Sequence, residues 1–196
     1  MKEKVYLQIT SGRGPAECCR VVALVLFSCA KKNKYLIKKK KKMISEKYGR
    51  TYHYPFSPGT TSDDRINHTY WEDIQRIKTL VHTEKLDGEN NCLSQWGVFA
   101  RSHAAPTTSP WTRQLRERWE LIKNDLGDIE IFGENLYAIH SIEYQRLETH
   151  FYIFAVRCMD QWLSWEEVKF YAALFDLPTV PELKIEPVSG LTPELL

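Results

Sequence analysis

The 196-residue sequence has no long hydrophobic run: the longest, at residues 21–30, spans ten positions and includes a serine. A helix that crosses a bilayer needs about 20 apolar residues, so we expect no membrane segment and no membrane partner. The five cysteines, at positions 18, 19, 29, 92 and 158, form no Cys-x-x-Cys pair and have no histidine at metal-ligand spacing. This pattern argues against a structural zinc site and a secreted disulfide framework, and it favours a reducing, cytoplasmic compartment.

The basic charge of the chain is concentrated in one short segment. Residues 31–50 hold ten Lys and Arg residues and a single acid, whereas residues 51–196 hold 13 basic and 22 acidic side chains. The overall net charge of +2 therefore conceals a net charge of −9 over residues 51–196, and the pI is no evidence for a basic nucleic-acid-binding body. We interpret residues 31–46 as a Lys-rich linker; a basic arm that contacts RNA phosphates is the alternative.

Residues 1–30 form an N-terminal fragment with its own pattern. Apolar residues alternate at positions 5, 7 and 9, which predicts a strand, and Pro15 and Glu17 predict a helix that begins at Ala16. Residues 7–24 resemble the start of a bacterial peptide-chain release-factor homologue. The Gly-Gly-Gln motif that such factors need for peptide release occurs nowhere in the chain, so release-factor activity is excluded.

Residues 47–196 are the body, in which we predict three helices. Capping boxes at residues 69–72 and 164–167 begin two of them, and Ser109-Pro110 begins the third. Apolar residues at 74, 77 and 80 continue the first helix, Gly127 ends the second in chain order, and the last ends before Pro178.

Strand-like runs alternate with these helices. They lie at residues 80–86, 92–101, 128–142 in two pieces, and 149–157. Strands bounded by turns, with helices placed irregularly between them, are typical of an α+β fold with antiparallel sheets.

The segment Thr-Glu-Lys-Leu-Asp-Gly-Glu-Asn-Asn at residues 83–91 carries the chemistry. From physical chemistry alone it is a hairpin, because two β-rich runs flank the turn dipeptide Asp87-Gly88. A surface turn with an exposed lysine is therefore the plain alternative to a catalytic site.

Three further motifs follow in order. Ala-Arg-Ser-His stands at residues 100–103, Ile-Phe-Gly-Glu-Asn-Leu-Tyr at 131–137 and Phe-Tyr-Ile-Phe at 151–154. With Lys-Leu-Asp-Gly at 85–88 and a leader at 47–65, the body resembles the RNA ligases of the covalent nucleotidyltransferase superfamily, most closely the small bacterial ATP-dependent RNA ligases. The resemblance implies an adenylation-domain fold of antiparallel sheets with flanking helices. It also implies ATP and Mg²⁺ as cofactors and RNA ends as partners.

The resemblance assigns a role to eight residues. Lys85 would be the nucleophile that forms a lysyl-adenylate, which then passes AMP to an RNA 5′-phosphate before a 3′-hydroxyl closes the strand. The nucleotide-binding residues would be Glu84, Asp87, Gly88, Asn90, Arg101, Glu134 and Phe154. Of these, Glu134 would bond the ribose hydroxyls, Phe154 would stack on adenine and Arg101 would hold a phosphate or ribose. Asp87 and Asn90 would orient the adenylate and the attacking RNA end, and backbone groups near Glu84 would select adenine.

Two departures from the family pattern leave alternatives open. Ala155 stands where family members often carry Asp, and neither the later Glu-Gly motif nor a Lys-x-Lys-like motif follows. We therefore expect a ligase domain that is incomplete at its C-terminus. A catalytically inactive remnant that at most binds nucleotide or RNA, a DNA ligase and an mRNA guanylyltransferase are the alternatives.

Overall fold

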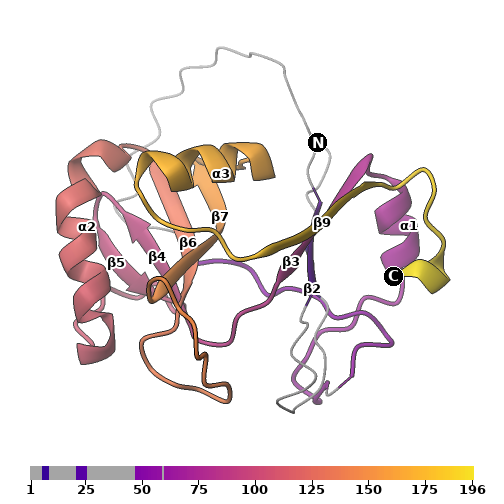
Figure 1. The fold of residues 1–196 in the computed structure, drawn as a ribbon, viewed down its shortest axis with the longest axis horizontal. Helices are drawn as coiled ribbons and strands as arrows, with labels where there is room; N and C mark the ends of the chain where they lie inside the picture. Colours follow the sequence, from indigo (N-terminus) through magenta and orange to yellow (C-terminus); the bar gives the residue numbers. More distant parts are fainter. Residues whose placement is uncertain (1–5, 9–20, 26–46, 59) are drawn as a thin grey trace.

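The computed structural model describes residues 6–8, 21–25, 47–58 and 60–196, which form two antiparallel sheets with three α-helices (Figure 1). This arrangement confirms the predicted α+β architecture. No helix of the described part is both long enough and apolar enough to cross a membrane.

The first sheet has four strands in the order β1-β2-β3-β9. Their bounds are Tyr6–Gln8, Val21–Val25, Thr79–Glu84 and Glu182–Pro187. Residues 21–25 pair with β3 as a strand, so the helix predicted from Ala16 is wrong for this part, and residues 16–20 lie outside the described residues. Three of these five residues are valine, and β-branched residues favour strands once a neighbouring strand offers hydrogen bonds.

The second sheet has five strands in the order β5-β4-β6-β7-β8. Their bounds are Gly97–Ala100, Glu89–Ser94, Ile129–Asn135, Phe151–Cys158 and Gln161–Trp162. The single run predicted at 92–101 is a hairpin of two strands that turns at residues 95–96. The second piece of the 128–142 run is not a strand, because the residues after Asn135 form the loop to β7.

The helices begin largely where the sequence predicts. Helix α2 (Arg113–Leu126) follows a 3-10 turn at Pro110–Thr112 and ends at Gly127, and α3 (Trp165–Leu174) has both hydrogen bonds of its capping box. Helix α1 (Tyr70–Gln75) is shorter than predicted, and Leu80 lies in β3 instead. Thr69 makes no side-chain capping bond to it, and the Thr69 hydroxyl donates instead to Asn67 Oδ1 at 3.0 Å.

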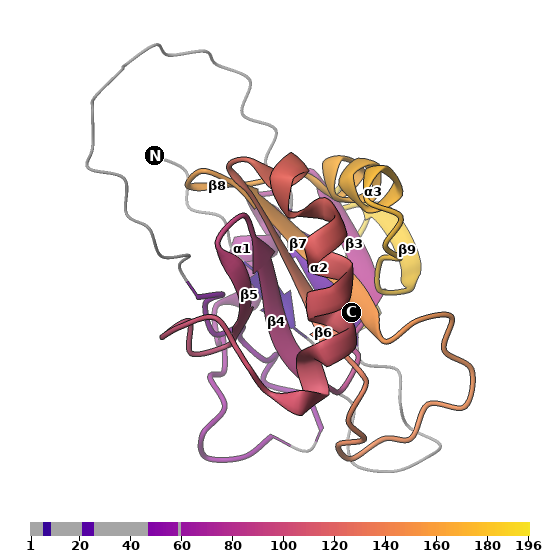
Figure 2. The same cartoon turned by 90° about the vertical axis from the view of Figure 1, so that its left-hand side faces the viewer.

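The main core lies between the five-stranded sheet and helices α2 and α3. Helix α2 packs on β4, β5 and β6, and α3 packs on β7 (Figure 2). Side chains such as Leu126 from α2, Val168 from α3 and Ile131 from β6 are almost fully buried there. A second, smaller core under α1 holds Tyr54 and Leu80. The four-stranded sheet and its helix therefore pack beside the larger layer, and the ends of β3 and β4 meet between them.

Candidate active site

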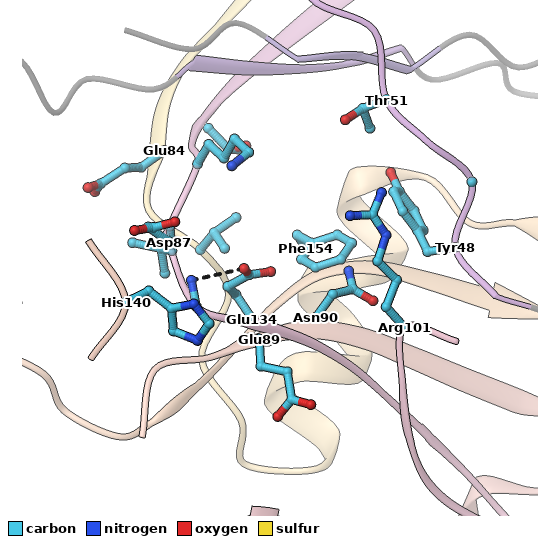
Figure 3. A pocket seen from close by; sticks show the side chains of 16 residues that line it. Tyr48, Thr51, Glu84, Asp87, Glu89, Asn90, Arg101, Glu134, His140 and Phe154 are labelled. Atoms are coloured by element: carbon cyan, nitrogen blue, oxygen red, sulfur yellow. Dashed lines mark hydrogen bonds between the residues drawn. The ribbon is translucent and has the colours of Figure 1, made fainter. Parts of the chain in front are cut away.

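One cavity of about 370 Å³ collects residues from both sheets. Thr83 and Glu84 come from β3, Asn90 from β4, Glu134 from β6 and Phe154 from β7. All eight residues assigned by the resemblance line this cavity: Lys85, Glu84, Asp87, Gly88, Asn90, Arg101, Glu134 and Phe154. In Figure 3, Glu84 and Asp87 lie on one side, Arg101 and Tyr48 on the other, and Glu134 and Phe154 between them. These eight residues are up to 70 positions apart in the sequence, from Glu84 to Phe154, and the fold brings them together.

Lys85 lies in the connection between β3 and β4, where it is partly buried. The residue before it is fixed to the rest of the fold, because the Glu84 amide donates to the Pro181 carbonyl at 2.8 Å. Burial raises the pKa of the Glu84 carboxyl above its ordinary value. The lysine therefore follows a backbone position that is fixed at the end of β3. The Glu84 carboxyl, which precedes it, is costly to ionise.

Gly88 permits the closest backbone contact in the site. A Cβ atom at this position would lie 2.4 Å from the Asn135 carbonyl oxygen and 2.8 Å from Leu136 Cδ2. The Gly88 amide donates to Glu134 Oε1 at 3.0 Å. A glycine is required here because any side chain would push β4 away from β6 and break this bond.

Glu134 is the most strongly perturbed acid of the cavity. Burial raises the pKa of its carboxyl from 4.5 to about 7, although the Gly88 hydrogen bond and the nearby charge of Lys85 pull it down. Near neutral pH this side chain can therefore either accept or donate a hydrogen bond. Asn90, directly opposite on β4, has a buried Oδ1 atom with no hydrogen-bond partner among the described residues. The two side chains offer polar atoms that a bound molecule can use.

A β-bulge directs Phe154 into the cavity. In the β6–β7 pairing, Phe132 lies opposite Ala155 but Gly133 lies opposite Ile153, which leaves Phe154 as the extra residue. Bulges bend a strand and redirect a side chain, and they are common beside active sites. The Phe154 ring meets the Tyr48 ring edge-on with centroids 5.1 Å apart. An aromatic face and edge therefore form one wall of the cavity.

Arg101 is exposed at the end of β5, with its side chain toward the cavity. His103 secures the turn behind it: this residue is buried at a φ of 51°, and its ring stacks on Phe99. His103 Nδ1 lies 3.3 Å from the Arg101 carbonyl oxygen. The Arg101 side chain is thus exposed, whereas its backbone is held by the turn.

Asp87 is held by the long loop between β6 and β7. Its carboxylate accepts hydrogen bonds from the Ser141 amide, at 3.0 Å, and from the Ser141 hydroxyl. Its own amide donates to the Tyr144 hydroxyl at 2.8 Å. This loop therefore fixes the turn that carries Lys85.

Comparison with known proteins identifies the family. A sequence model described as "RNA ligase" matches residues 78–195, more than half of the chain and the part that lines most of the cavity. The chain belongs to the RNA ligase family. No curated protein matches it.

Solved structures of RNA ligases share its fold. One titled "Archaeal ATP-dependent RNA ligase - form 1" aligns with a TM-score of 0.50 and 21% identity over 60% of this chain and 35% of that chain. A second, form 2 of the same title, gives a TM-score of 0.49 and 20% identity over the same shares. This chain thus spans about a third of the length of those archaeal ligases.

The departures from the RNA ligase pattern can now be located. Ala155 is buried with Cys92, Phe99 and Phe132, an apolar setting in which a carboxylate would lack water. The segment Glu-Leu-Lys at residues 182–184 has only one of the two lysines of a Lys-x-Lys motif, and it lies in β9, where Lys184 pairs with Glu186 and does not line the cavity. The described residues hold no cluster of three or more His, Cys, Asp or Glu side chains that could hold a metal ion.

Several cavity residues had no predicted role. Tyr48, Thr51, His140 and Val180 also line the cavity, and Ser141 and Tyr144 hold Asp87. Tyr48 belongs to the leader that the resemblance includes, but no periodicity or motif links the 140–144 loop to Asp87, more than 50 positions away. Only the tertiary structure shows these residues.

Proposed function

We propose that this chain carries out the nucleotidyl transfer of an ATP-dependent RNA ligase at Lys85. Lys85 Nζ attacks the α-phosphorus of ATP, a P–N bond forms, the bond to the bridging oxygen breaks and pyrophosphate leaves, while the amine gives up a proton. The AMP then moves to the 5′-phosphate of an RNA, and attack by a 3′-hydroxyl joins the strands and releases AMP. The observation that carries this proposal is the gathering of Lys85, Arg101, Glu134 and Phe154 around one cavity.

The lysine must react as the free amine, which is scarce at neutral pH because the reference pKa of lysine is about 10.4. Arg101 extends into the cavity from the side opposite Glu84 and Asp87, where its guanidinium can bind phosphate oxygens in a two-pronged fork.

The remaining residues would hold the nucleoside. Glu134 and the unpartnered Asn90 Oδ1 offer hydrogen-bond acceptors for the ribose hydroxyls. Phe154, redirected by the bulge and backed by Tyr48, offers its ring to the base. The cavity volume of about 370 Å³ lies within the range of small-molecule sites.

The cavity wall fits magnesium only as an ion that protein carboxylates and substrate phosphates would hold together. Mg²⁺ commonly binds through one or two carboxylates plus substrate phosphates, and Glu84 and Asp87 lie together on the cavity wall. When bound, the ion would neutralise phosphate charge. The protein residues themselves place the nucleotide.

The proposal is tested by covalent labelling. Incubation of the full chain with ATP labelled at the α-phosphate, and with magnesium, should leave label on the protein, and Lys85→Ala should abolish it. Lys123→Ala is the matched control, because Lys123 lies on α2 in an ion pair with Glu120, away from the cavity. Label that persists in Lys85→Ala would contradict the assignment of the nucleophile.

Base choice separates this proposal from the guanylyltransferase alternative. Aromatic stacking tolerates every base, so Phe154 alone does not select adenine. Unlabelled ATP should compete with the label far better than GTP. Equal competition by GTP would favour a capping-type enzyme, and ATP binding seen as a thermal shift without label would favour the inactive remnant.

A further inference from the structure

A second hollow of about 310 Å³ adjoins the lysine cavity. Glu89 and His140 line both spaces, and the second one adds Ser109, Trp111, Asn135 and Ala138. In Figure 3 the Glu89 side chain points away from the centre of the lysine cavity. None of the residue roles proposed for nucleotide binding involves this second hollow.

The Trp111 ring lines this hollow, and the exposed ring of Tyr137 lies beside Trp111. Trp111 is 58% exposed, and Tyr137 is 37% exposed, with ring centroids 6.4 Å apart. The Tyr137 ring is supported edge-on by His150 at 5.2 Å. Exposed apolar side chains that cluster beside a concave site mark interaction surfaces more often than those scattered singly.

One buried side chain holds both aromatic residues in place. Asn135 Nδ2 donates to the Trp111 carbonyl at 3.2 Å, and Asn135 Oδ1 accepts from the Tyr137 amide at 3.1 Å. Asn135 is 3% exposed and follows Glu134 in β6, where successive side chains point to opposite faces. The same strand therefore presents Glu134 to the lysine cavity and fixes the aromatic pair on the other side.

We propose that Trp111 and Tyr137 bind an unpaired base of the RNA strand whose end reaches the lysine cavity. This inference rests on the proposed function for the identity of the strand. Unpaired bases stack on aromatic rings and bond through their edges, and Glu89 and Ser109 place an acceptor and a hydroxyl beside the rings. Arg113, two residues after Trp111, is largely exposed in an ion pair with Glu117 at 3.7 Å, which a phosphate of the strand would have to displace. Because Asn135 fixes the backbone of Trp111 and Tyr137, these two residues lose little backbone entropy when a base binds.

The test measures the affinity of the full chain for a fluorescent eight-nucleotide oligouridylate with a 5′-phosphate, and for the same strand with abasic positions. Trp111→Ala and Tyr137→Ala should each weaken binding of the oligouridylate about tenfold and leave binding of the abasic strand unchanged. Trp111→Phe, which keeps an aromatic face, should restore most of the affinity. Phe170→Ala is the matched control, because Phe170 is 62% exposed on α3.

Equal affinity of wild type and Trp111→Ala for the oligouridylate would overturn the proposal, and so would an equal loss for the abasic strand. The titration needs no ATP, so its result does not depend on whether Lys85 accepts label. Absence of label with a positive titration would reject the ligase chemistry and keep the base site.

Discussion

Glu134 shows how a single position can link folding to pH. Its carboxyl is buried beside the Gly88 amide, and its pKa of about 7 means that ionisation in the folded state is costly. In the unfolded chain the same group ionises near 4.5. Its stabilising contribution is therefore fully present below about pH 4.5 and is lost as the pH rises through 7.

We expect Glu134→Gln to remove this pH dependence. Gln keeps an acceptor for the Gly88 amide but cannot ionise, so the variant should gain on wild type by up to about 3 kcal/mol between pH 4.5 and 8. Urea unfolding across this range measures the difference. Glu117→Gln is the control, because Glu117 is exposed and its pair with Arg113 should contribute little. Parallel curves for wild type and Glu134→Gln would show that the carboxyl titrates normally.

At the scale of elements, the junction of β4 and β6 depends on the absence of a side chain. Gly88→Ala should destabilise the fold by about 1–3 kcal/mol, because the added Cβ would meet the Asn135 carbonyl and the strands must move apart. Gly190→Ala, where no atom lies within 4 Å, should be nearly neutral. The denaturant midpoints of both variants measure this difference in stability. Equal shifts of the two midpoints would mean that the β4–β6 junction relaxes freely around the added Cβ.

The helices show what local sequence can and cannot predict. Helix α3 was predicted correctly because Ser164 and Glu167 form both hydrogen bonds of the capping box within one turn. Helix α1 was predicted to extend too far because the apolar spacing of residues 74, 77 and 80 runs on into β3, which contains Leu80. Local signals hold where side chains bond within a turn, and they fail where a neighbour in space competes.

The features of the candidate site also divide into those that the sequence predicts and those that only the tertiary structure shows. All eight residues to which the resemblance assigns a role, such as Lys85 and Glu134, line the cavity. The bulge at Phe154 and the attachment of Asp87 to Ser141 and Tyr144 carry no sequence signal, since both depend on how β6, β7 and their loop pair in space.

At the scale of the whole molecule, charge is distributed unevenly along the chain. The body from residue 51 onward is acidic, whereas residues 38–42 are five consecutive lysines. Non-specific affinity for RNA should therefore come mainly from the lysines, through release of counterions from phosphates.

Replacement of lysines 38–42 by serine should weaken RNA binding at low salt and make its salt dependence shallower. The logarithmic slope should fall by about 3 if each lysine neutralises one phosphate of a single strand. A salt titration of both proteins against one oligonucleotide measures the slope. An unchanged slope would place the phosphate contacts in the acidic body itself.

The wide spacing of the cavity residues has a consequence for synthesis on the ribosome. The wall contains Tyr48 near one end of the body and Val180 near the other, with Lys85, Arg101, Glu134 and Phe154 between them. A nascent chain cannot enclose a nucleotide until Val180 has left the exit tunnel, so incomplete products cannot bind ATP through the whole cavity. Once the chain is finished, a bound nucleotide favours the folded state by mass action.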